Sequence, residues 1–332
     1  MLAGEYAVLR GAPAVVAAID RRARVTVARG SGSHHALTTP GYLEGTWHFR
    51  KHEGDVFEWR QPLPDPAAFA LVEAIWNSFE TTAWPALSVA IDTRAFYDRP
   101  GGCKLGLGSS AAVTASLTAA LQQVDAAGCA RGNLRHALAF DAHSRFQGGR
   151  GSGVDVAASL QGGLLRYRRG NVDAHRLRWP EDLKCRFLWS GRPAVTADKL
   201  KLLDANDSRQ ARDSMRALSV AAENAASAWS SGASPKIMAA MREFTAALRR
   251  FSIDLGLGIF DAGHAQLADL AAAGEVVYKP CGAGGGDIGV VLAASGSAID
   301  EFCVLAAERG FRRLDVQTDE QGVLTEVRQD LE

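Results

Sequence analysis

A glycine- and serine-rich stretch in the first half of the chain has the residue types needed to bind a phosphate. It reads KLGLGSSAAV (residues 104–113) and leads into a segment with a helical apolar repeat. Its two glycines permit tight turns, and Ser109 and Ser110 can cap the following helix. Unpaired amides and the dipole at a helix start attract an anion, and Lys104 could reach a phosphate. Taken alone, the stretch fits a plain helix cap at least as well.

Two further glycine-rich stretches add to this chemistry. KPCGAGGGDIG (residues 279–289) precedes an apolar strand, and its clustered glycines would let the backbone come close to a phosphate. QGGRGSGVDVAAS (residues 147–159) carries the carboxylate of Asp155, which could orient an attacking hydroxyl or merely cap a helix. A flexible turn is the alternative for residues 279–289, but flexible linkers are seldom framed so closely by apolar strands, which favours a functional loop. Together, the three stretches supply the phosphate cradles, cation and oriented nucleophile that phosphoryl transfer needs.

Composition excludes several other classes of protein. The 332 residues include 37 Lys+Arg and 37 Asp+Glu, and this zero net charge argues against a broad nucleic-acid or membrane-binding surface. Five cysteines without a CxxC motif indicate reduced thiols rather than a disulfide framework. No apolar run is long enough to span a membrane, so we expect a cytoplasmic protein. The partners we expect are small molecules, with neither nucleic acid nor membrane.

Hydrophobic periodicity predicts an α+β protein with two lobes. The predicted domains are residues 1–180 and 181–332. The helices expected from the apolar repeats cover residues 66–79, 133–147, 208–230, 235–251, 260–273 and 298–309, and a further helix is expected to follow a small-residue turn within residues 106–124. The strands expected from alternation or short apolar runs include residues 87–92, 185–190, 276–279, 288–293, 312–317 and 324–328.

Taken together, these motifs resemble the GHMP kinase family. GEYAVL (residues 4–9), the stretch at 106–112 and the stretch at 279–289 match the family's three motifs in the family's order. GEYAVL and WSGRPA (residues 189–194) are similar to the phosphomevalonate kinases within the family. The resemblance implies a two-lobed GHMP kinase fold, with a left-handed β-α-β unit in the N-terminal lobe and a ferredoxin-like C-terminal lobe. It also implies that ATP and an acceptor bind between the lobes.

The resemblance further implies roles for individual residues, with ATP and Mg²⁺ as cofactors. Asp155 and Lys104 would be catalytic, and Ser110 would lie near Mg²⁺. The residues implied to bind ATP are Gly106, Leu107, Gly108, Ser109, Ser110 and Ala111. The residues implied to bind the acceptor, or to close over it, are Tyr6, His143, Gln147, Ser152, Arg192, Gly282, Ala283, Gly284, Gly285, Gly286 and Asp287.

The start of the chain departs from the family pattern. The family normally has Pro-Gly-Lys shortly before Gly-Glu, whereas only Met1, Leu2 and Ala3 precede Gly4 here. We expect a start codon placed too late rather than a lost lysine. The function implied is phosphorylation of a small acceptor, with 5-phosphomevalonate first and mevalonate or another alcohol or sugar as alternatives. A non-catalytic protein that binds nucleotide or metabolite is the other alternative, and a homodimer is one candidate assembly.

Overall fold

The structure, a computed structural model, divides into two compact units. It describes residues 1–81, 84–99, 102–125, 132–170, 174–194, 199, 201–203, 206 and 208–328. Each unit combines separate stretches of sequence: unit 1 comprises Met1–Asp20, Cys103–Leu107 and Gly162–Glu320, and unit 2 comprises Arg21–Gly102, Gly108–Gln161 and Gln321–Glu332. Because the units interleave along the chain, the domain boundary at residue 180 stays a prediction.

Unit 1 contains a four-stranded antiparallel sheet with the strand order β10-β11-β9-β12. Along the chain, a strand and helices are followed by a hairpin, another helix and a last strand, which is the βαββαβ order of a ferredoxin-like fold. This confirms the predicted ferredoxin-like arrangement. The elements are β9 (Lys184–Trp189), α6 (Arg209–Ser231), α7 (Ser234–Asp254), α8 (His264–Ala272), β10 (Val277–Pro280), β11 (Ile288–Ala293), α9 (Gly296–Ala307) and β12 (Arg312–Arg313).

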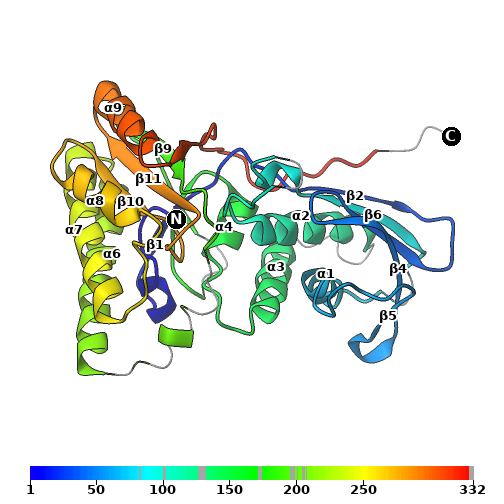
Figure 1. Cartoon of the computed structure of the whole chain (residues 1–332). Helices are drawn as coiled ribbons and strands as arrows, with labels where there is room; N and C mark the ends of the chain where they lie inside the picture. Colours follow the sequence, from blue (N-terminus) through cyan, green and yellow to red (C-terminus); the bar gives the residue numbers. More distant parts are fainter. Residues whose placement is uncertain are drawn as a thin grey trace. The chain divides into compact units, whose positions relative to one another are not determined.

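The helices of unit 1 supply most of its core. α6 and α7 pack against each other along their length (Figure 1), and a short turn at Gly232 joins them. Their facing sides bury Trp229, Phe244 and Phe251 together with residues of β10 and β11. Both strands of that hairpin are buried at every position, so the hairpin holds the loop that it carries on a rigid base.

A second, three-stranded sheet of unit 1 fixes the first motif of the sequence. It consists of β1 (Ala14–Ala17), β7 (Leu164–Tyr167) and β8 (His175–Leu177), in the order β1-β7-β8. A short 3₁₀ helix, η1 (Ala7–Arg10), precedes β1. Arg168 and Arg169, which follow β7, donate hydrogen bonds to the carbonyls of Gly11 and Leu9. The GEYAVL turn is therefore held from the end of the neighbouring strand.

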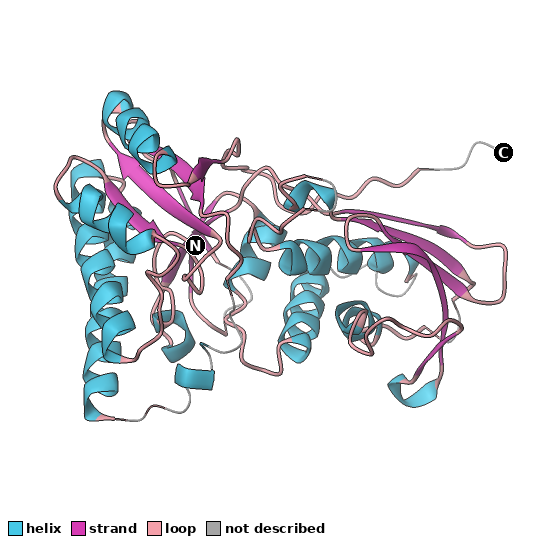
Figure 2. Ribbon diagram, in the orientation of Figure 1, coloured by secondary structure: helices cyan, strands magenta, loops and turns pink. Residues whose placement is uncertain are grey.

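Unit 2 is a five-stranded sheet with a helical layer (Figure 2). Its strand order is β2-β6-β3-β4-β5, antiparallel except for the parallel pair β3 and β6. The left-handed β-α-β unit stays a prediction. The elements are β2 (Arg24–Arg29), β3 (His35–Thr39), β4 (Leu43–Lys51), β5 (Phe57–Trp59), α1 (Ala70–Trp76), β6 (Leu87–Asp92), α2 (Ser109–Val124), α3 (Gly132–Phe146) and α4 (Val154–Gln161).

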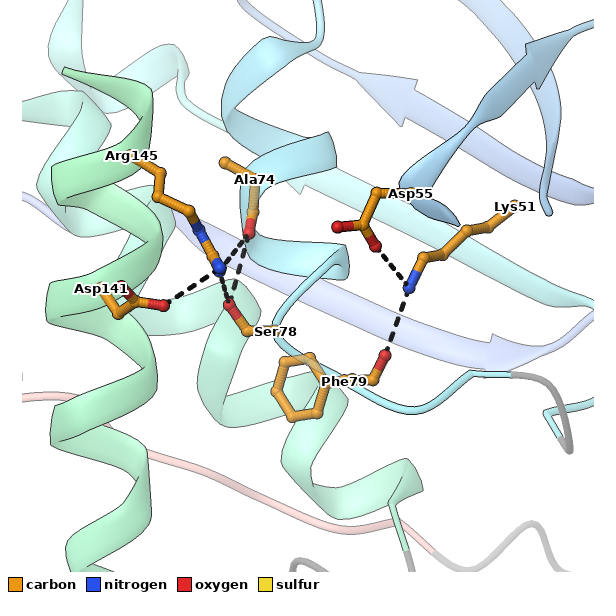
Figure 3. A network of polar contacts seen from close by, with 7 residues as sticks. All are labelled: Lys51, Asp55, Ala74, Ser78, Phe79, Asp141 and Arg145. Carbon is orange, nitrogen blue, oxygen red and sulfur yellow. Dashed lines mark hydrogen bonds and ion pairs between the residues drawn. The ribbon is translucent and has the colours of Figure 1, made fainter. Parts of the chain in front are cut away.

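Polar side chains hold the end of α1 against its neighbours in unit 2 (Figure 3). Arg145 on α3 donates hydrogen bonds to the carbonyl of Ala74 and the hydroxyl of Ser78. Lys51 at the end of β4 donates to the carbonyl of Phe79. Carbonyls at a helix end lack partners within the helix, so these cations satisfy them. The contacts fix α3, which also carries His143.

The structure corrects three of the sequence predictions. The helix predicted from residue 66 begins at Ala70, because the Asp65 carboxylate accepts a hydrogen bond from the Ala67 amide and forms a turn there. The strand predicted at 312–317 is reduced to Arg312–Arg313. The strand predicted at 324–328 does not form, and Leu324 and Val327 are exposed, because no neighbouring strand pairs with this segment. Leu324 and Val327 lie three positions apart, so their spacing is not the alternation of a half-buried strand.

Two absences apply to the described part of the chain. None of its helices is both long and apolar enough to cross a membrane. The four cysteines within it, Cys103, Cys185, Cys281 and Cys303, are free thiols, whereas Cys129 lies outside the described residues.

Candidate active site

The loop between β10 and β11, residues 282–286, is held by side chains that bind its carbonyls. The Tyr6 hydroxyl donates to the carbonyl of Ala283 at 2.7 Å. His264 lies 3.1 Å from the carbonyl of Gly286 through Nε2, and its Nδ1 lies 2.7 Å from the Tyr278 hydroxyl. Since a carbonyl only accepts, Nε2 carries the proton and Nδ1 accepts from the tyrosine. Burial lowers the pKa of His264 to about 4, so the ring is neutral near pH 7.

Asp287, directly after this loop, joins three stretches of unit 1. Its amide donates to the carbonyl of Arg192 at 2.6 Å, and its Oδ1 accepts from the amide of Ala194 at 3.1 Å. Its side chain lies against Gly106, where an added Cβ would come within 2.2 Å of the Asp287 Cγ. The glycine-rich stretches at residues 104–113 and 279–289 therefore meet at this carboxylate, together with the WSGRPA segment.

The surroundings of Asp287 shift its ionisation. Burial raises the pKa of this carboxyl, while the charges of Lys104 and Lys199 and the hydrogen bond from Ala194 oppose the shift. Lys104 therefore lies close enough to act on Asp287, and its side chain is exposed. Arg192 contributes its carbonyl to the contacts described above, so a contact of its exposed side chain with the acceptor stays a prediction.

The start of α2 differs from the cap predicted from the sequence. The N-cap is Gly108, with φ +77°, and no side chain caps the helix. Ser109 and Ser110 are the first two helical residues, so the prediction that they cap the helix is wrong. The hydroxyls of these two serines do not accept hydrogen bonds from the first amides of α2. Those amides are therefore available to an anion. The Oγ of Ser110 lies 3.4 Å from Nε2 of the buried His143.

A second helix start lies beside it within unit 2. Ala111 on α2 and Val156 on α4 belong to one buried cluster, and α2 and α4 pack against each other. Asp155 is in the first turn of α4, where a carboxylate is favoured by the helix dipole, and its Oδ1 accepts from the amide of Val156 at 3.0 Å. The structure therefore brings Ser110 and Asp155 into one region.

The remaining predicted residues line the approach to α4. The Ser152 hydroxyl accepts from the amide of Val154 at 3.4 Å. Gln147 follows α3, and its Oε1 occupies the space that a side chain at Gly151 would need. His143 is 1% exposed, and its predicted contact with the acceptor stays a prediction. The roles of Gln147 and Ser152 in acceptor binding stay predictions.

Two parts of this site were not predicted from the sequence. Glu5 and Lys279 form an ion pair at 2.5 Å that is completely buried in unit 1. Lys199 binds carbonyls of the 282–286 loop and comes from a segment without any motif. In the sequence, the only sign of the ion pair was that each of two motifs contains a charged residue. Nothing in the sequence indicated a role for Lys199.

Comparison with known proteins identifies the family. A phosphomevalonate kinase from Streptomyces sp. (strain CL190) is 30% identical over 88% of this chain and 87% of its own length. The family model described as "GHMP kinases N terminal domain" matches residues 71–163. The chain belongs to the GHMP kinase family. It is accordingly an ATP-dependent kinase, and the interpretation as a non-catalytic binding protein is not supported.

Other GHMP kinases support the same assignment. A mevalonate kinase from Aeropyrum pernix is 28% identical over 64% of this chain and 57% of its own length. The crystal structure of Streptococcus pneumoniae phosphomevalonate kinase in complex with phosphomevalonate and AMPPNP has a TM-score of 0.75, with 20% identity and 96% of both chains covered. These structural matches confirm the predicted α+β GHMP kinase fold.

The side chains of the site suit a magnesium–nucleotide complex better than a separate metal centre. Within the described ranges, no three His, Cys, Asp or Glu side chains gather closely enough to hold a metal ion. Mg²⁺ commonly keeps several waters and binds substrate phosphates with only one or two protein oxygens. The Ser110 hydroxyl at the start of α2 is a suitable oxygen for that purpose.

Proposed function

We propose that this kinase transfers the γ-phosphoryl group of ATP to the phosphate of 5-phosphomevalonate, which gives 5-diphosphomevalonate. The observation that carries the proposal is the similarity to the Streptomyces phosphomevalonate kinase, which extends over nearly the whole chain. The mevalonate kinase similarity covers a smaller part of the chain, so mevalonate is the second candidate acceptor. The product places the reaction in the formation of isoprenoid precursors.

The proposed roles at the nucleotide follow from the helix start. The amides of residues 106–111 would bind the ATP phosphates, because the first turn of α2 offers donors that no side chain uses. Lys104 would add a positive charge as the phosphoryl group separates from ADP. Mg²⁺, held by the nucleotide phosphates and the Ser110 hydroxyl, would neutralise charge on the phosphoryl oxygens.

The acceptor in this proposal is itself a phosphate. Its second ionisation occurs near pH 6, so it is mostly a dianion at neutral pH and needs no base to attack. An acceptor oxygen would form a bond to the γ-phosphorus while the bond to the ADP oxygen breaks, and ADP would leave with that electron pair. Asp155 would orient the acceptor rather than remove a proton from it. If mevalonate were the acceptor, Asp155 would instead accept its hydroxyl proton.

The glycine loop has a separate proposed role. Amides of the 282–286 loop would hydrogen-bond phosphate oxygens, with Tyr6 and Asp287 fixing the loop from either side. Arg192, Gln147 and Ser152 would contact the acceptor. A cationic side chain is needed for a phosphorylated acceptor, and Arg192 is the predicted one.

Initial rates of ADP release test the proposal. The assay uses MgATP with 5-phosphomevalonate, mevalonate, galactose or homoserine as separate acceptors. We expect the highest kcat/KM with 5-phosphomevalonate and little turnover without an acceptor. Turnover of mevalonate with none of its phosphate would refute the proposed acceptor and favour the second candidate.

A further inference from the structure

Lys199 binds three main-chain carbonyls at one point of unit 1. Its Nζ donates to Gly284 O at 2.7 Å, to Gly258 O at 3.1 Å and to Ala283 O at 3.4 Å. A lysine ammonium has three donor hydrogens, so each carbonyl can receive one. Two of these carbonyls belong to the 282–286 loop, and the third belongs to the segment before α8.

We propose that Lys199 is a positioning residue whose ammonium acts as a built-in monovalent cation that holds the 282–286 loop in its phosphate-binding conformation. Carbonyl oxygens that converge on one point repel one another unless a cation lies between them, as in carbonyl-lined potassium sites. The inference rests on the proposed function only for the role of the loop in binding phosphate. The role of Lys199 as a cation applies to the protein without substrates and does not depend on the proposed function.

The glycines of the loop are required for this arrangement. An added Cβ at Gly285, where φ is +74°, would lie 2.2 Å from the Nζ of Lys199 and 2.7 Å from the carbonyl oxygen of Gly258. At Gly284 it would lie 2.5 Å from the carbonyl oxygen of Ile259. The backbone therefore closes around the ammonium with no room for side chains. Packing excludes side chains at these glycines, in addition to the conformational preference of glycine for positive φ.

Burial and nearby charges act in opposite directions on the pKa of Lys199. Lys199 is half-buried, and burial lowers its pKa, but the carboxylates of Asp261 and Asp287 oppose that shift. The positive charge also acts on His264, whose pKa it lowers. Partial desolvation strengthens the hydrogen bonds that Lys199 donates, and the nearby carboxylates favour its charged form.

Holding the carbonyls leaves other groups of the loop available. Ala283 O receives both Tyr6 and Lys199, so both lone pairs of this oxygen are used. In contrast, the amides of Ala283 and Gly286 have no acceptor in the described part of the chain. Donors of this kind, presented by a glycine-rich turn, form an anion-binding site. Lys199 therefore acts on phosphate through the loop and not by direct contact.

Hydrogen exchange of the loop in the substrate-free protein tests the proposal. Lys199→Ala removes the ammonium and leaves the carbonyls around an empty space. We expect the peptide covering residues 281–288 to exchange about tenfold faster or more, because hydrogen bonds to a charged group are lost. Adding K⁺ or NH₄⁺ to this variant should restore slow exchange, whereas Li⁺ or choline at the same ionic strength should not.

Two further variants separate charge from packing. Lys199→Met keeps the aliphatic stem, so exchange should be fast and K⁺ should not slow it. Lys201→Ala, an exposed lysine from the same segment, is the matched control and should behave like the wild type. In the kinase assay, Lys199→Ala should raise the KM for a phosphate-bearing substrate more than it lowers kcat, and K⁺ should reverse the KM effect.

The outcomes are distinct from those of the acceptor assay. Unchanged exchange in Lys199→Ala, or fast exchange that neither K⁺ nor NH₄⁺ slows, would overturn the cation role even in an active kinase. Should Lys199→Ala fail to fold, Lys199→Met is compared with Lys201→Ala, and equal exchange in those two overturns the proposal. Failure of every acceptor would refute the proposed function while the exchange result still stands.

Discussion

Replacing Glu5 by leucine removes one partner of an ion pair that lies completely inside unit 1. The side chains of Lys279 and Glu5 are 0% and 1% exposed, and Nζ lies 2.5 Å from Oε1. Beyond this contact, the ammonium lies 5.9 Å from the centre of the Phe244 ring, and Oε2 of Glu5 has no hydrogen-bond partner among the residues that the structure describes. The variant therefore leaves a buried ammonium without its counter-charge.

The expected cost follows from this burial. Removing one member of a buried ion pair typically costs about 3–5 kcal/mol of the free energy of unfolding, because the remaining charge stays desolvated. Replacing both members by apolar residues of similar volume is often close to neutral. Since Oε2 is unsatisfied, the pair does not recover its full desolvation cost. We therefore expect the double variant Glu5→Leu/Lys279→Met to lie within about 1 kcal/mol of the wild type.

Urea unfolding followed by tryptophan fluorescence measures these free energies. The single variants Glu5→Leu and Lys279→Met should each be strongly destabilised, and the double variant should recover most of the loss. Asp269→Asn, which breaks the exposed pair with Arg249, is the control and should cost no more than about 1 kcal/mol. Single variants as stable as this control, or a double variant whose loss equals the sum of the two, would refute the reasoning.

Three other predictions concern the loop, the acidic residue and pH. Gly285→Ala should cost far more activity and stability than Gly282→Ala in matched assays, since φ is positive at both but only at Gly285 would the added Cβ meet backbone, 2.7 Å from the carbonyl oxygen of Gly258. Asp155→Asn should lower kcat at least about tenfold with unchanged thermal stability, and equal kcat would remove Asp155 from the mechanism. The pKa of His264 is lowered to about 4, so the unfolded chain binds its proton first, and stability should fall from about pH 6.5 to pH 4 and then level off. The loss should reach about 3 kcal/mol and be absent in His264→Gln, which urea titrations across this range will show.

The glycine motifs could be predicted from the sequence because their function depends on local backbone properties. Gly106 and Gly108 have positive φ, as tight turns require, and the motif leads directly into α2. The long helices α6 and α7 could also be predicted, since their apolar repeats extend over many turns. What these patterns show is local conformation and which side of an element is buried.

Contacts between distant residues could not be predicted in this way. Glu5 and Lys279 are 274 positions apart, and Lys199 contacts the loop 85 positions further along. A lysine in a segment without a recognisable motif has no pattern that distinguishes a bound ammonium from a solvated one. The strand expected at 324–328 shows the same limit, because pairing depends on whether another strand is adjacent, which the local sequence does not reveal.

The identity of the reaction product shows directly whether the phosphate of 5-phosphomevalonate is the acceptor. The purified protein is incubated with MgATP and 5-phosphomevalonate, and the mixture is followed by ³¹P nuclear magnetic resonance. We expect the phosphomonoester signal of the acceptor to be replaced by the two coupled signals of a diphosphate monoester as ADP accumulates. An unchanged acceptor signal, alongside formation of a new phosphomonoester when mevalonate is supplied instead, would contradict it.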